Sequence, residues 1–93
     1  MPIGFLTLEI HLPEAHSLKE KRMVVRKIKD RLRARFNVAV AELDHQELWQ
    51  RARIGVVSLA SDRVVVEKLL EMVERELERM LGRDLIITER TVF

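Results

Sequence analysis

The sequence predicts one α+β domain in which four strands and two helices follow in the order βαββαβ. Three observations favour this class. The chain has 93 residues, enough for one hydrophobic core and too few for two. Hydrophobic residues make up 47% and charged residues 34%, a balance typical of folded domains rather than of disordered or membrane-embedded chains. Apolar side chains recur at alternate positions or in β-branched runs in some segments, and at helical spacing in two others.

The first strand and helix are the clearest part of this pattern. Residues 5–12 alternate between apolar and polar, which predicts a half-buried strand that ends at Pro13. Ser17 and Glu20 have the S-x-x-E spacing of a capping box, so the Ser17 hydroxyl should accept from the Glu20 amide while the Glu20 carboxylate bonds back. The helix that begins there should run to about Phe36. Its expected buried stripe is Val25, Ile28, Leu32 and Phe36.

Two strands, a second helix and a last strand are expected to follow. The expected strands are residues 38–43, 51–60 and 85–92. The first two are joined by the polar connection 44–50, which contains the single tryptophan. Ser61-Asp62 is a typical helix cap and Gly82 a typical helix end. The apolar positions of the helix between them are Val66, Leu69, Leu70, Val73, Leu77 and Met80.

Right-handed crossovers convert this element order into a ferredoxin-like βαββαβ sandwich, with a four-stranded antiparallel sheet and two helices on one face. We expect residues 1–93 to form this single domain. The architecture hosts enzymes, regulators, RNA binders and structural modules, so it does not select a function.

Several classes of function are disfavoured because the sequence lacks the residues or segments that they need. The absence of cysteine excludes disulfides, thiolate metal sites and cysteine nucleophiles. The three glycines, Gly4, Gly55 and Gly82, lie too far apart to form a phosphate-cradling loop. No signal-peptide pattern precedes the first strand and no apolar run is long enough to span a bilayer, so we expect a cytoplasmic protein. The arginine-rich, cysteine-free composition fits a thermophile.

Three motifs are distinctive: residues 16–22 (HSLKEKR), 35–38 (RFNV) and 42–52 (ELDHQELWQRA). Together they resemble the YlxP family of bacterial proteins of unknown function, along nearly the whole chain. The resemblance implies a ferredoxin-like domain in the cytoplasm. Because genes of that family often lie near those for transcription antitermination, translation initiation and ribosome assembly, it also implies a link to RNA. It supplies no catalytic or binding residue, so the site has to be argued from chemistry.

Positive charge is concentrated in the first helix. Residues 19–35 hold nine basic and two acidic side chains, a local charge of +7, whereas the rest of the chain carries −5. At roughly 100° per residue, five cations share a sector of about 80° in a row about 21 Å long. They are Lys19, Arg22, Arg26, Lys29 and Arg33; a second row on the opposite flank is Lys27, Arg31 and Arg35. The first row could bind the phosphates of RNA or of the ribosome.

Structural interpretations compete with that hypothesis. The cations could be solvated side chains whose stems cover the core, or they could pair with the acidic second helix. The acidic residues of that helix include Glu67, Glu71, Glu74, Glu76 and Glu78. An RNP-type base-stacking surface is not expected, because Phe5 is the sole aromatic of the first strand and the third strand has none. Bound RNA would therefore contact the helix side or the loops, through its shape rather than its sequence.

The connection 44–50 is the densest polar cluster, with Asp44, His45, Gln46 and Trp49 as its notable members. General acid–base chemistry would pair His45 with Asp44 or Glu47. The interpretation that we favour is a hairpin in which Asp44 or Gln46 bonds the backbone and Trp49 anchors the loop against the sheet edge.

Catalysis and metal binding are not expected. The spacing of His11, His16 and His45 matches no local metal-ligand motif, and Ser17 is better explained as a helix cap than as a nucleophile. We therefore expect a non-enzymatic binding module with no cofactor, no metal and no small-molecule substrate.

A protein–protein module, most simply a homodimer, is the alternative class of function. A ferredoxin-like sheet leaves one face open, and apolar residues such as Phe5, Val57 and Leu59 are expected on it. The two hypotheses are compatible, because a dimer would double the basic surface.

Overall fold

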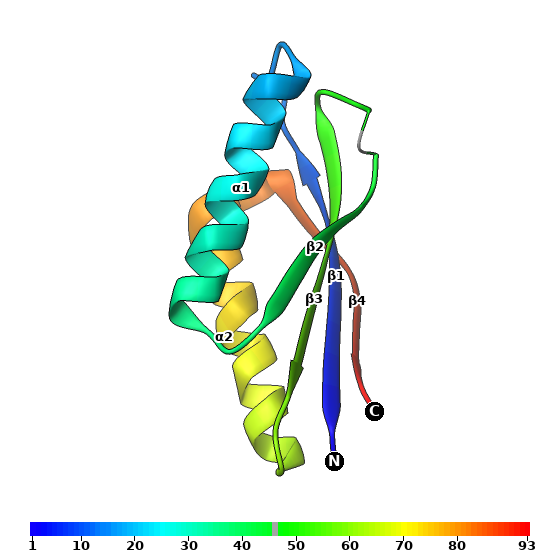
Figure 1. Ribbon diagram of the computed structural model, residues 1–93, viewed down its shortest axis with the longest axis vertical. Helices are drawn as coiled ribbons and strands as arrows, with labels where there is room; N and C mark the ends of the chain where they lie inside the picture. The colour runs from blue at the N-terminus through cyan, green and yellow to red at the C-terminus, as the bar shows by residue number, and fades with distance from the viewer. Residues whose placement is uncertain (46) are drawn as a thin grey trace.

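The computed structural model describes residues 1–45 and 47–93, and its elements follow the predicted order (Figure 1). They are β1 (Ile3–His11), α1 (Leu18–Arg35), β2 (Ala39–Asp44), β3 (Arg51–Leu59), α2 (Arg63–Leu81), a short 3-10 turn (Gly82–Asp84) and β4 (Leu85–Val92). Their bounds differ from the expected ones by at most two residues. Element ends depend on partners and caps more than on the hydrophobic pattern, which explains these small shifts.

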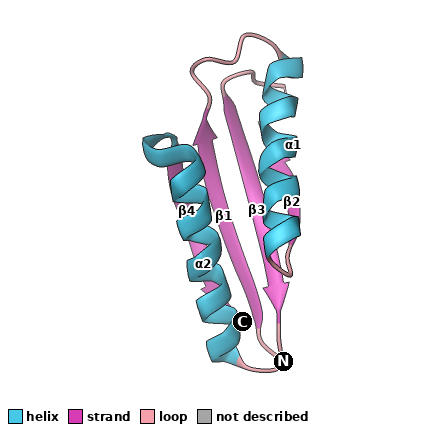
Figure 2. Ribbon diagram, turned by 90° about the vertical axis from the view of Figure 1, so that its left-hand side faces the viewer, coloured by secondary structure: helices cyan, strands magenta, loops and turns pink. Residues whose placement is uncertain are grey.

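The strands form one antiparallel sheet in the order β2-β3-β1-β4, and both helices cover the same face of it (Figure 2). This arrangement confirms the predicted ferredoxin-like sandwich. α1 lies over the β2 side of the sheet and α2 over the β4 side. The domain measures 42 × 22 × 21 Å, and the helices leave the opposite face of the sheet uncovered.

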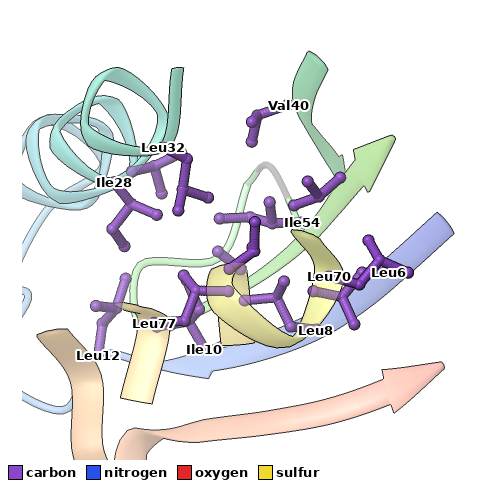
Figure 3. Close-up of a cluster of buried hydrophobic side chains, with 14 of the residues drawn as sticks. Leu6, Leu8, Ile10, Leu12, Ile28, Leu32, Val40, Ile54, Leu70 and Leu77 are labelled. Carbon is purple, nitrogen blue, oxygen red and sulfur yellow. The ribbon is translucent and has the colours of Figure 1, made fainter. Parts of the chain in front are cut away.

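The hydrophobic core fills the layer between the sheet and the helices (Figure 3). It contains the alternate residues of β1 and the stripes of both helices, among them Leu6, Leu8, Ile10, Ile28, Leu32, Leu70 and Leu77. Three members of the predicted stripes, Phe36, Leu69 and Met80, are only partly buried. Two charged side chains that no stripe predicted, Lys21 and Glu76, are buried.

A glycine in β1 sets how closely α2 can approach the sheet. A Cβ atom added at Gly4 would lie 2.5 Å from Val66 Cγ1 and 3.1 Å from Leu70 Cδ1. A Cβ contact of 2.5 Å essentially never occurs in proteins and one of 3.1 Å is tight, so α2 packs directly on the β1 backbone at this point.

The helix ends match their predicted caps. Ser17 Oγ accepts from the Glu20 amide at 3.1 Å, while the Glu20 carboxylate bonds back to the amide of His16 rather than to that of Ser17. Asp62 caps α2 by accepting from the Val64 amide at 2.9 Å. Gly82 ends α2 with a φ of 55°, which glycine adopts without strain. Neither α1 nor α2, the two long helices of the described chain, is apolar enough to cross a membrane.

Candidate nucleic-acid interface

The first row of cations lies along the edge of α1 that faces β2. We call it the outer basic row: Lys19, Arg22, Arg26, Lys29 and Arg33. Four of these side chains are exposed and Lys29 is partly buried. The orientation of the row follows from Arg33, whose Nη2 donates to the backbone oxygen of Val40 in β2 at 3.0 Å. That bond also occupies an acceptor of an edge strand that would otherwise be open to another chain.

Two of the three cations on the opposite flank of α1, Arg31 and Arg35, are paired with α2, whereas the exposed Lys27 has no carboxylate within 4 Å among the described residues. Arg31 Nε lies 2.7 Å from Glu76 Oε2, and Arg35 Nη1 lies 3.2 Å from Glu76 Oε1. Arg79, one turn along α2, adds a third contact at 3.3 Å. The hydrogen bond from Arg31 and the charges of Arg35 and Arg79 lower the pKa of Glu76 below its ordinary value despite the opposing effect of burial. For Arg31 and Arg35, the interpretation of the cations as structural partners of the second helix is confirmed.

Other acidic residues of α2 pair with cations outside α1. Glu71 and Glu74 pair with Arg90 of β4 at 3.3 and 3.1 Å, and Glu67 pairs with Arg63 of its own helix at 2.8 Å. None of these pairs involves α1. The cross-helix neutralisation is thus confined to Glu76 and the flank that faces it.

Carboxylates do not neutralise the outer basic row in this way. In the part of the chain that the structure describes, Lys19, Arg22, Arg26 and Lys29 have no carboxylate within 4 Å. Lys19, Arg22 and Arg26 line a surface hollow together with the exposed Met23. One flank of α1 is therefore a line of unpaired positive charge on a rigid helix, which is the arrangement that phosphate contacts require.

Lys21 is one of the nine basic residues of segment 19–35, but the structure buries it. Its side chain is 0% exposed, with Nζ 2.9 Å from Glu42 Oε2 of β2. Its ammonium also donates to the backbone oxygen of His45. A signal was present in the sequence, because Lys21 lies four residues before Val25 and so continues the buried stripe towards the helix start. This pair attaches the beginning of α1 to the β2–β3 connection.

His45 does not have the partner that acid–base chemistry would have required. Its ring Nε2 lies 3.1 Å from Glu9 Oε1 of β1, rather than beside Asp44 or Glu47, and Arg51 Nη2 donates to the same oxygen at 2.9 Å. Burial raises the pKa of Glu9, but the bonds and charges of His45 and Arg51 outweigh it, so the pKa lies below its ordinary value. This group is an ion-pair cluster on the open face of the sheet.

The hairpin interpretation of the connection is correct for Asp44, whose Oδ1 accepts from the His45 amide at 2.8 Å. His45 itself has a φ of 65°, in the left-handed region typical of tight turns. The expected role of Gln46 lies outside the described residues. The expectation for Trp49 is wrong: the side chain is 52% exposed, so it does not anchor the loop by burial.

The histidines do not form a metal site in the described residues, which contain no group of three or more His, Asp or Glu side chains arranged to hold an ion. Ser17 serves as a helix cap, as described above.

The open face of the sheet is divided into an apolar and a charged half. Near the termini, Phe5 faces Val57 and Ile3 faces Leu59 across the β1–β3 pairing. Leu59 is 51% exposed, and Phe93, whose backbone pairs with Ile3, is 68% exposed. At the other end lies the cluster around Glu9. The apolar residues expected on this face are there, with Phe5 partly buried.

Comparison with known families supplies the classification. Residues 3–90 match a family described as "Protein of unknown function (DUF503)". The chain belongs to this family. It is also 42% identical over 71 residues to "Uncharacterized protein YlxP" of Bacillus subtilis (strain 168), an alignment that covers 76% of this chain and 77% of that protein. The resemblance stated from the three motifs is confirmed.

Two of those three motifs meet in the fold. The first begins α1 and the third forms the end of β2, the connection and the start of β3. They are joined by the Lys21–Glu42 pair. Gln50 further ties the third motif to the turn before α1, because its Nε2 donates to the backbone oxygen of Pro13 at 3.2 Å. These two motifs therefore gather at the end of the domain where the outer basic row begins.

Proposed function

We propose that this domain is a non-enzymatic module that binds RNA through the outer basic row of α1. The observation that supports this proposal is the asymmetry of the helix. Two of the three cations on the flank that faces α2, Arg31 and Arg35, are paired with Glu76, whereas Lys19, Arg22, Arg26 and Lys29 have no carboxylate partner among the described residues. Structural pairing therefore accounts for Arg31 and Arg35 and not for the outer basic row.

The row suits backbone recognition. It extends over about 21 Å of a helix that the core holds rigid, so its charges are positioned before a ligand arrives. The central strands of the open face offer only the partly buried Phe5 as an aromatic, so RNP-type stacking on the sheet does not fit. The choice of RNA, including ribosomal RNA, rests on the gene context that the family resemblance implies.

The number of phosphate contacts predicts how strongly salt should weaken RNA binding. Five phosphate contacts predict a slope of log K against log salt concentration of about −3.5 for a single strand, at about −0.7 per contact. Affinity should then fall roughly a hundredfold between about 50 and 200 mM salt. A weaker slope would mean that fewer of the five cations contact phosphate.

The test is fluorescence anisotropy of labelled ribosomal RNA fragments and duplex DNA across that salt range. The triple variant Arg22→Glu, Arg26→Glu, Lys29→Glu should abolish binding at physiological salt and leave the circular-dichroism spectrum unchanged. The matched control is Lys68→Glu, Arg75→Glu, Arg83→Glu, which changes the net charge equally at three exposed positions outside the row. Binding that survives the first triple change, or is lost equally in the control, would contradict the proposal.

A second candidate function is self-association through the apolar half of the open sheet face. The exposed Leu59 and Phe93 support it, because exposed apolar side chains that gather on one face mark interaction surfaces. The domain extents of 42 and 22 Å give the whole face roughly 900 Å², close to the about 800 Å² per partner of a standard interface. The apolar half alone supplies roughly 450 Å² per copy, so a second copy would also have to cover part of the charged half. Multi-angle light scattering from micromolar to millimolar concentration should detect a dimer that Leu59→Asp abolishes. A monomer at every concentration excludes it.

A further inference from the structure

We propose that Trp49 forms a base-stacking platform at the end of the outer basic row, so that the preferred ligand is single-stranded rather than double-stranded RNA. This inference rests on the proposed function and extends it from phosphate binding to the kind of strand bound.

The exposure of Trp49 is the first observation. The single tryptophan of the chain is 52% exposed and its neighbour Leu48 is 45% exposed, although burial of such side chains is favourable. Both line a surface hollow in the β2–β3 connection, together with Glu47, Gln50 and Arg51. An exposed indole face is the kind of surface on which an unpaired base stacks.

The charges of the hollow favour a base over a phosphate. The carboxylate of Glu47 repels phosphate but not the face of a neutral base. Arg51, on the other side of Trp49, is already bonded to Glu9. The hollow therefore complements the outer basic row: the row binds the phosphate backbone of the RNA, and the hollow accommodates one of its bases.

The backbone on both sides of Trp49 is held in place. The His45 carbonyl accepts from the Leu48 amide at 3.0 Å and from the buried ammonium of Lys21. On the other side, the Gln50 carbonyl accepts from the Leu12 amide at 2.8 Å, and its side chain donates to the backbone oxygen of Pro13. A platform that is ordered before binding loses little conformational entropy when a base stacks on it.

The same contacts place the platform beside the start of the row. Lys21 lies between Lys19 and Arg22 in the chain and holds the β2–β3 connection by its buried side chain. The start of α1 and this connection lie at the same end of the domain (Figure 1). A single strand of RNA can thus run along α1 and place one of its bases on Trp49. The bases of a duplex are stacked on one another and are not available for this contact.

The single tryptophan is also the reporter for the test. Wild-type protein is titrated with a 12-nucleotide single-stranded RNA, with the same sequence as a duplex, and with inorganic polyphosphate, which supplies charge without bases. Single-stranded RNA should quench the fluorescence of Trp49 and polyphosphate should not. Trp49→Ala should weaken single-stranded RNA binding roughly 5- to 150-fold, the range for one stacked base. Its affinity for polyphosphate should stay within about twofold of wild type, because charge is unchanged.

Two control variants separate the possible outcomes. Leu48→Ala removes an exposed apolar side chain from the same hollow without removing a ring and should leave RNA affinity nearly unchanged, while Trp49→Phe should retain most of it. Wild-type RNA affinity in Trp49→Ala, equal quenching by polyphosphate, or tighter binding of the duplex would overturn the inference and leave the proposed function intact. If wild-type protein binds neither RNA nor polyphosphate, both proposals are wrong.

Discussion

The buried Lys21–Glu42 pair offers a direct test of what joins α1 to the β2–β3 connection. Lys21 is fully buried, and its only counter-charge within 4 Å in the described chain is the Glu42 carboxylate at 2.9 Å. Replacing Lys21 by Met keeps most of the side-chain volume but leaves that carboxylate unpaired. Removing one partner of a buried pair costs about 3–5 kcal/mol. Because Glu42 retains some contact with solvent, we expect the lower end of this range, about 3 kcal/mol.

The measurement is a double-mutant cycle in urea denaturation, supported by thermal melts. For a domain of this size, a loss of about 3 kcal/mol lowers Tm by about 12–24 °C. The double variant Lys21→Met, Glu42→Leu removes both charges together, so it should lose less than about 1.5 kcal/mol and reveal a coupling energy of at least about 2 kcal/mol. Additive single effects, or a cost below about 1 kcal/mol for Lys21→Met, would show that the pair does not hold this junction.

Two further predictions concern packing and pH. Gly4→Ala should destabilise the domain by about 1–3 kcal/mol, because the new methyl group would collide with Val66, and Val66→Ala in the same chain should restore part of the loss in a thermal melt. Acidification should destabilise the domain as the pH falls below about 4.5. The pKa values of Glu9 and Glu76 are lowered from that ordinary value, so their charged forms stabilise the fold at higher pH and this contribution disappears as they protonate. Urea unfolding between pH 3 and 7 should show a flatter profile for Glu9→Gln and Glu76→Gln than for wild type; identical profiles would contradict the assignment.

The secondary structure and the core could be predicted from the sequence because their determinants are local. Alternation in β1 and helical spacing in α1 and α2 identify the buried faces within a few residues of chain. Ser17, Asp62 and Gly82 mark helix ends through contacts within four residues. The handedness of βαβ crossovers then leaves one simple way to assemble the elements into two layers.

The candidate site could be predicted only as a set of residues. The five cations of the outer basic row follow from the sequence and the geometry of a helix. Which of the cations on α1 are paired does not follow, because Arg31 and Arg35 meet Glu76 across more than forty residues of chain. Nor could the sequence indicate that the ring of His45 bonds to Glu9 or that Trp49 stands exposed, since both depend on how the connection folds back on the sheet.

The sequence by itself therefore determined the fold class, the element order, the family and the position of the basic row. Tertiary structure decided which cations of α1 are paired, that Lys21 is buried, and that two of the family motifs meet at one end. The physical reason is the range of the interactions. Periodicity and capping act between residues a few positions apart, whereas neutralisation of a charge depends on partners that only the packed fold brings within about 4 Å.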